Sequence, residues 1–202
     1  MDIVGLDRRA ASLTVISRLL LAAPEADVLA ALRDPDQLAE WPTPEGADEG
    51  LALLASSEDG VEDVRIDHQR LFGGAGPARA NPFESVHRSE EGLKFDEQTV
   101  QVRAAYRELG LQAPRLNREP DDHIGLELEF MATAYLRAAE LLEVGEPADE
   151  VLAVAARFNR EHLQEWAPHL FDLVVEHAET DFYRGIGRLG RALLELLPQS
   201  VS

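Results

Sequence analysis

Residues 119–131, EPDDHIGLELEFM, hold the side chains whose types and spacing are best suited to chemistry. His123 and Glu127 are four residues apart, so on a helix they share a face and could form a hydrogen-bonded acid–base pair or hold a metal. In a structural alternative, Asp121 and Asp122 cap the helix and His123 is exposed in its first turn. Because helix caps are far commoner than sites, spacing alone favours the structural alternative.

The same stretch predicts the element that positions these side chains. Pro120 keeps the residue before it out of helical conformation, and the acidic residues that follow suit the positive end of a helix. Apolar residues then recur at helical spacing: Ile124, Leu128, Met131, Tyr135 and Leu142. The pattern predicts a core helix of about five turns, preceded by a loop. A loop held by a rigid helix is a suitable platform for a binding residue.

Short motifs on both sides of this stretch add a family resemblance. They are RLFG at 70–73, NPFESV at 81–86, HLQEW at 162–166 and TDFY at 180–183. With the EPDDH stretch, they resemble in order and separation the signature of the redox-enzyme maturation chaperones, the TorD/DmsD/NarJ-like family. The likeness covers nearly the whole chain. It implies a cytoplasmic, non-catalytic chaperone that binds the twin-arginine signal peptide and the apo-form of a molybdenum-cofactor oxidoreductase, assists cofactor insertion and delays export.

The resemblance also implies which residues bind the signal peptide. They are Glu119, Pro120, Asp122 and His123 in one segment, and Leu71, Phe72, Pro82, Glu84 and Ser85 in the other. Carboxylates such as Asp122 and Glu84 are expected to accept bidentate hydrogen bonds from the arginines of the peptide. Nearby apolar side chains would take its hydrophobic region, as in helix-in-groove recognition.

Composition restricts the class of partner. The chain has 202 residues, 45% of them hydrophobic, which suits a single domain over residues 1–202. Cysteine is absent, which favours a reducing compartment and excludes disulfides and thiolate metal sites. A net charge of −19 repels nucleic acids and anionic membranes, and a basic partner is its natural complement. Acidity that serves only solubility, or that reflects a salt-rich cytoplasm, remains an alternative.

The periodicity of the chain predicts an all-α fold. No stretch shows clear two-residue alternation, so we expect a TorD-like bundle of about eight to ten helices. Residues 73–95 lack a strong period and are expected to form a long irregular connection. Arg8 and Arg9 precede an apolar stripe, but Arg18 interrupts it, which favours a core helix over an export signal. The longest apolar run, six residues at 151–156, is far shorter than a membrane span of about 20 residues.

Motifs for enzyme chemistry are scarce. The sequence holds no Gly-x-Ser-x-Gly, its six histidines form no zinc-ligand motif, and residues 73–77, GGAGP, lack the lysine and hydroxyl of a phosphate loop. We therefore expect no cofactor, no metal and no catalytic residue. Two alternatives stay open: a metal-dependent all-α hydrolase centred on Asp122 and His123, and a helical protein-binding scaffold without an export role. Either a monomer or a homodimer is compatible with the sequence.

Overall fold

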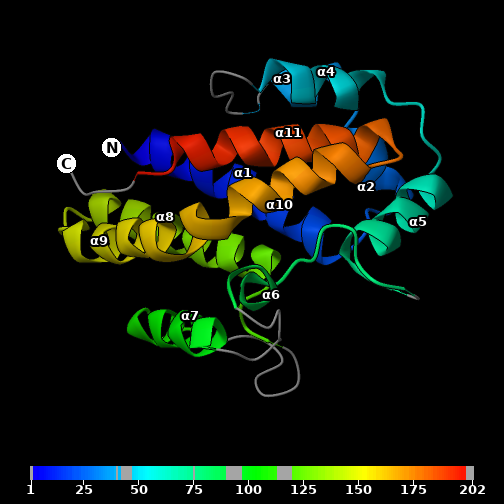
Figure 1. The fold of residues 1–202 in the computed structure, drawn as a ribbon. Coiled ribbons are helices and arrows are strands. Elements are labelled where there is room, and N and C mark those ends of the chain that lie inside the picture. Colours follow the sequence, from blue (N-terminus) through cyan, green and yellow to red (C-terminus); the bar gives the residue numbers. More distant parts are fainter. Residues whose placement is uncertain are drawn as a thin grey trace. The chain divides into compact units, whose positions relative to one another are not determined.

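The computed structural model describes residues 2–39, 41, 47–74, 76–89, 97–112 and 120–198, and these residues fold almost entirely into helices (Figure 1). The helices are α1 (Ile3–Leu21), α2 (Ala26–Ala31), α3 (Pro35–Ala39), α4 (Asp48–Ser56), α5 (Val61–Phe72), α6 (Glu84–Arg88), α7 (Glu97–Glu108), α8 (Ile124–Glu143), α9 (Asp149–Phe158), α10 (Gln164–His177) and α11 (Asp181–Leu196), with a π-helical segment η1 (Asn159–Leu163). The all-α prediction is confirmed. No helix in this part of the chain is both long and apolar enough to cross a membrane.

The chain divides into two compact units. The first unit contains residues 1–17, 83–166 and 197–202, and the second contains 18–82 and 167–196. Two of the boundaries fall inside helices, one in α1 and one in α10. The single domain expected from the sequence therefore stays a prediction, and each unit is described by itself.

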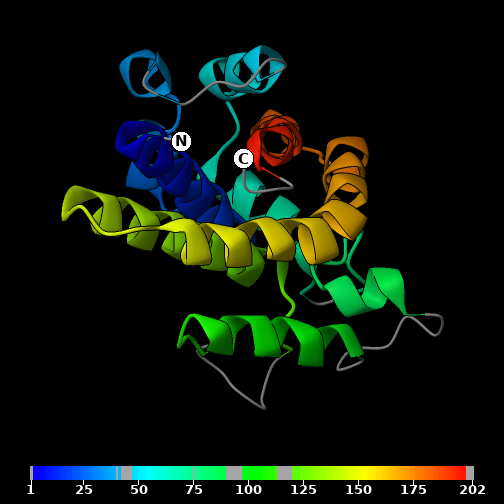
Figure 2. The same ribbon diagram turned by 90° about the vertical axis from the view of Figure 1, so that its left-hand side faces the viewer.

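The core of the first unit is built on α8, which packs against α9 (Figure 1). Tyr106 of α7 stacks on Phe130 of α8 with ring centroids 5.0 Å apart, and Phe130 lies 4.6 Å from Phe158 of α9. Three helices thus meet at one aromatic cluster, whose members are nearly or fully buried. Helices α6 and α7 are also neighbours, as both views show (Figure 2).

In the second unit, α11 packs closely against two helices because it carries glycines at the contacts. A Cβ atom on Gly185 would lie 2.9 Å from the backbone oxygen of Gly50 in α4, and one on Gly50 would lie 3.0 Å from the oxygen of Gly185. The backbones of α4 and α11 therefore touch. A Cβ on Gly190 would overlap the ring of Phe171 in α10, so the α10–α11 contact also requires glycine.

Two helix ends carry the residue types that helix termini favour. Thr180 caps α11, because its hydroxyl accepts the N–H of Tyr183 at 3.2 Å. Helix α7 is followed by Gly110, whose φ of +65° is the left-handed conformation expected of a C-terminal glycine. One element was not expected: α6 lies within residues 73–95, the stretch predicted to be irregular.

Candidate functional site

The turn that precedes α8 is hydrogen-bonded to the turn that precedes α6. The first turn belongs to one of the segments that the family resemblance marks, and the second turn belongs to the other. Phe83 and His123 form an isolated antiparallel β-bridge. Next to it, the N–H of Glu84 donates to the carbonyl oxygen of Asp122 at 3.0 Å. Both segments belong to the first unit. Residues some 40 positions apart in the sequence therefore form one local structure, which we call the paired turn (residues 83–85 and 121–123).

Asp122 is the centre of the paired turn. Its side chain is fully buried. Oδ2 accepts the backbone N–H of Ser85 at 2.7 Å, and Oδ1 accepts the hydroxyl of Thr99 at 2.7 Å. The carboxylate thus caps the N-terminus of α6 rather than α8, which corrects the expected cap. In this arrangement Asp122 presents no free oxygen to an arginine of another chain, which corrects that expectation as well.

His123, rather than an aspartate, is the N-cap of α8. Its Nδ1 accepts the N–H of Gly125 at 3.0 Å, so this nitrogen is unprotonated. The imidazole meets the ring of Phe83 edge-on, with centroids 5.1 Å apart. His123 keeps an intermediate exposure. It is therefore the member of the paired turn's second segment that can touch a ligand.

Asp121 fixes the paired turn to α7. Arg103 Nε donates to Asp121 Oδ2 at 2.5 Å, and the Tyr106 hydroxyl donates to the Asp121 carbonyl oxygen at 3.1 Å. Burial raises the pKa of the Tyr106 hydroxyl well above its usual value, and the negative charges of Glu127 and Asp121 add to the effect. Tyr106 therefore stays a neutral hydrogen-bond donor. The paired turn is held to α7 through both the side chain and the backbone carbonyl of Asp121.

Glu84 is buried and already has a cationic partner from its own chain. Arg88 Nη1 forms an ion pair with Glu84 Oε1, and His162 Nδ1 lies 2.9 Å from Oε2. Arg88 also donates to the carbonyl oxygen of Glu161 at 2.9 Å. The expected role of Glu84 as acceptor for a peptide arginine does not fit this arrangement, because Arg88 occupies that position.

Glu127 completes a group of buried carboxyls. Trp166 Nε1 donates to its Oε2 at 3.2 Å. Burial raises the pKa of Glu127 well above its ordinary value, the charges of Glu84 and Asp122 raise it further, and the hydrogen bond from Trp166 opposes the shift. A protonated Glu127 can donate to Glu84, and this hydrogen bond also raises its pKa. Among the described residues, the donor that contacts the Glu127 carboxyl is thus Trp166.

The predicted site residues fall into three groups. Glu119 lies outside the described residues. Leu71, Phe72 and Pro82 are buried in the second unit, where Phe72 lies 5.7 Å from the ring of Tyr183. The others belong to the first unit and, apart from His123, are buried: Pro120, Asp122, Glu84 and Ser85. Most of these side chains therefore form the framework of the two units rather than their surface.

The structure adds residues that the sequence reasoning did not single out. Thr99 and Arg103 lie four apart on α7, and both donate to the aspartates of the paired turn. Glu127, which the sequence paired with His123, also has a signal for burial, because it shares the core-facing stripe of α8 with Ile124 and Leu128. A carboxylate on such a stripe indicates a buried polar contact.

The described residues offer no metal site. Among them, no three His, Asp or Glu side chains lie where they could jointly hold a metal ion. Asp122, the centre of the hydrolase alternative, has both oxygens occupied by hydrogen bonds from its own chain. Nothing in this part of the protein favours the hydrolase alternative.

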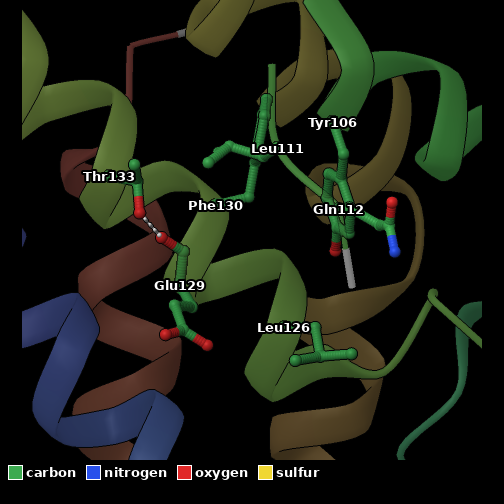
Figure 3. Close-up of a pocket in the computed structure, with 7 residues that line it drawn as sticks. All are labelled: Tyr106, Leu111, Gln112, Leu126, Glu129, Phe130 and Thr133. Carbon is green, nitrogen blue, oxygen red and sulfur yellow. Dashed lines mark hydrogen bonds between the residues drawn. The ribbon is translucent and has the colours of Figure 1, made fainter. Parts of the chain in front are cut away.

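A small open hollow lies next to the paired turn, between α8 and the end of α7 (Figure 3). It measures about 130 Å³. Glu129 and Thr133 line one side, and Tyr106, Leu111 and Gln112 line the other, with Leu126 and Phe130 completing it. Tyr106 therefore connects the two features: its ring lines the hollow and its hydroxyl holds Asp121.

Comparison with known proteins places the chain in one family. The sequence profile of the family described as nitrate reductase delta subunit matches residues 39–172. The chain is 30% identical over 194 residues to the Tat proofreading chaperone DmsD of Salmonella typhi, covering 93% of this chain and 88% of that protein. It is 25% identical over 148 residues to the chaperone protein TorD of Vibrio parahaemolyticus, covering 73% of this chain and 68% of that one.

A solved structure shares the fold. A protein from Archaeoglobus fulgidus described as a redox enzyme maturation protein superposes with a TM-score of 0.57 and 22% sequence identity, over 93% of each chain. The all-helical fold and the sequence matches lead to the same class. This chain belongs to the TorD/DmsD/NarJ-like family of redox-enzyme maturation chaperones.

Proposed function

We propose that the protein is a cytoplasmic chaperone that binds the twin-arginine signal peptide and the apo-form of a molybdenum-cofactor oxidoreductase. It would hold the enzyme while cofactor is inserted and delay export until then. The observation that carries this proposal is the 30% identity, over 93% of the chain, to a protein named as a Tat proofreading chaperone. No catalytic step is needed for this role.

In this proposal the paired turn is the recognition site, and its residues have different roles. His123, at the surface, contacts the peptide. Asp122 and Glu84, both buried, act as positioning residues that fix the backbone on either side of His123. This division supports a site that is formed before the peptide arrives, which lowers the ordering cost of binding.

The charge of the chain supports a basic ligand. Its net charge is −19, and a peptide with two adjacent arginines is attracted to such a protein from a distance. This attraction raises the association rate more than the final affinity. Binding is therefore expected to weaken as salt is added, through slower association.

Calorimetric titration of the full chain tests the proposal. The ligands are the leader peptide of a molybdenum-cofactor oxidoreductase and the same peptide with Lys-Lys in place of Arg-Arg. We expect the Arg-Arg peptide to bind more tightly, because a planar guanidinium stacks on an aromatic ring such as the imidazole of His123 better than an ammonium does. Equal binding of both peptides, or binding of neither, would contradict the proposal.

Two matched variants test the role of His123. His123→Asn retains a good N-cap residue for α8 but removes the imidazole. We expect it to weaken binding of the Arg-Arg peptide with little change in the thermal midpoint. His169→Asn, at an exposed position of α10, is the control and should bind as the unmodified protein does. If both variants bind normally, the paired turn is not the contact surface.

A further inference from the structure

The contact between α1 and α8 in the first unit contains buried polar atoms without a partner. Ser17 of α1 donates to the carbonyl oxygen of Gly125 at 2.7 Å, which fixes the start of α8 against α1. Further along both helices, Nε of Arg9 and the hydroxyl oxygen of Tyr135 are buried, and neither has a hydrogen-bond partner among the described residues. Buried polar groups in folded proteins are nearly always paired, so these two require an explanation.

Arg9 and Tyr135 act on each other electrostatically. Burial raises the pKa of the Tyr135 hydroxyl above its ordinary value, and the positive charge of Arg9 opposes this shift. Arg9 precedes Ser17 by eight residues, and Tyr135 follows Gly125 by ten, so the two helices run in opposite directions. The two contacts are therefore about 12–15 Å apart along the helices, at 1.5 Å per residue.

A third group of this kind lies one helical turn from Arg9. Ser12 is 2% exposed, and its buried hydroxyl also has no partner in the described part of the chain. A hydroxyl inside a helix commonly donates to the carbonyl oxygen four residues earlier, as Thr14 does to Ala10 at 2.8 Å. Arg9 and Ser12 are three residues apart, so they share a face of α1.

The guanidinium group of Arg9 also lacks a counter-charge. No carboxylate of the described residues forms an ion pair with it, although acidic residues outnumber basic ones by 38 to 19 along the chain. A guanidinium can only donate hydrogen bonds, and both hydroxyls are able to donate. Three donors beside one positive charge match the chemistry of an anion.

We propose that Arg9, Ser12 and Tyr135 form a binding site for a small inorganic anion, for which chloride is the probe. Tyr135 is fully buried and Ser12 nearly so, and a ligand that reaches both hydroxyls must therefore be small. Arg9 is half-buried, so an ion can approach along its side chain from solvent. The net charge of −19 repels anions from a distance, and we expect binding to be weak and to require high salt.

An anion at this site would fix α1 to α8, the helix on which the core of the first unit is built. A ligand that binds only the folded state raises its stability as the ligand concentration rises. Any salt also screens the mutual repulsion of the many carboxylates, which stabilises an acidic protein without a site. The site adds a response to the kind of anion, and it is independent of peptide binding.

Thermal unfolding in two salts of equal ionic strength separates these effects. The salts are sodium chloride and sodium gluconate, each at about 0.5 M, so that general screening is the same in both. Gluconate is too large to reach both hydroxyls. We expect the midpoint of the unmodified protein to be about 3 °C higher in chloride. Equal midpoints would overturn the proposal and would assign the three groups to ordered water.

Tyr135→Phe tests the hydroxyl, because it keeps the ring in the core. In gluconate we expect its midpoint to equal or exceed that of the unmodified protein, since a buried group without a partner has been removed. The increase in chloride should disappear. A midpoint lowered equally in both salts would contradict the proposal, because the hydroxyl would then have a structural role.

Arg9→Gln tests the charge, and Arg8→Gln is its matched control. Arg8 is exposed and adjacent on the same helix, so both variants change the net charge equally. We expect the increase in chloride to be lost in Arg9→Gln and kept in Arg8→Gln. Loss in both would assign the effect to net charge and overturn the proposal.

The width of the chloride NMR line measures binding without unfolding. We expect the unmodified protein and Arg8→Gln to broaden the line, and Arg9→Gln and Tyr135→Phe to broaden it much less. Equal broadening by all four proteins would place the bound chloride elsewhere and overturn the proposal.

Discussion

The carboxylate of Asp122 accepts the backbone N–H of Ser85 at 2.7 Å, although 37 residues separate the two along the chain. Helix α6 has only five residues, too few to be stable by its own propensity. Its N-terminus is satisfied by a side chain from a distant segment. The residue that the family resemblance marks as peptide-binding is thus, in this structure, the support of a neighbouring helix.

Removing the Asp122 carboxylate should therefore destabilise the fold. Asp122→Ala loses two buried hydrogen bonds to a charged group, and we expect the free energy of unfolding to fall by about 3 kcal/mol. In Asp122→Asn the amide oxygen can still accept the N–H of Ser85, and the amide N–H can donate to the hydroxyl of Thr99. The loss of unfolding free energy should therefore be about half as large. Denaturant unfolding measures both. A stable Asp122→Ala variant that fails only in peptide binding would show that Asp122 contacts the ligand instead.

The buried carboxyl of Glu127 predicts a pH effect. Its pKa is raised from the usual 4.5, chiefly by burial, so between about pH 4.5 and the raised value the folded state binds a proton that the unfolded state has lost. Stability from this group is present at low pH and is lost as pH rises. Glu127→Gln has a neutral side chain that cannot ionise, so this residue no longer lowers the stability as pH rises.

We therefore expect Glu127→Gln to gain stability over the unmodified protein as pH rises above about 4.5, by up to about 1.4 kcal/mol per pH unit. Denaturant unfolding at a series of pH values measures the difference. Glu129→Gln, exposed on the same helix, is the control and should give a flat difference. A flat difference for Glu127→Gln would mean that Glu127 is ionised in the folded state.

The close contact of α10 and α11 predicts intolerance of a single methyl group. Gly190→Ala places a Cβ on the ring of Phe171, and we expect a loss of about 1–3 kcal/mol. A Cβ at Gly76 would meet nothing within 4 Å, so Gly76→Ala should be close to neutral. Thermal unfolding of both variants provides the comparison. Equal midpoints would show that the two helices can separate at little cost.

Thr180 links the start of α11 to α5 within the second unit. Its hydroxyl donates to Asp67 Oδ2 at 2.7 Å and accepts the N–H of Tyr183. Thr180→Val keeps the shape but loses both bonds, which should cost about 1–2 kcal/mol. Thr133→Val is the matched control, because its hydroxyl donates only within its own helix, to the carbonyl oxygen of Glu129. If Thr180→Val and Thr133→Val lose similar amounts of stability, the effect comes from helix propensity alone.

The sequence predicted the elements whose signals are local. The apolar stripe beginning at Ile124 identified α8. Helix α6 was missed because what stabilises it is the side chain of Asp122, which no local pattern connects to Ser85. The family resemblance marked residues that the structure brings together in the paired turn, and their binding role stays a prediction. Burial of Asp122 and Glu84 depends on tertiary packing, which spacing does not encode.

The π-helical segment η1 determines how the first unit tolerates changes in chain length. A π-turn accommodates one residue more than an α-turn, which shifts every later side chain by about 100° around the axis. Phe158 precedes this offset and packs on Phe130, whereas Trp166 follows it and reaches Glu127. Deleting one residue from η1 would return the segment to ordinary α-helical turns and leave these two anchors close to their present phase, whereas inserting one would rotate them apart by about 100°. In η1 a one-residue insertion should therefore be more damaging than a one-residue deletion.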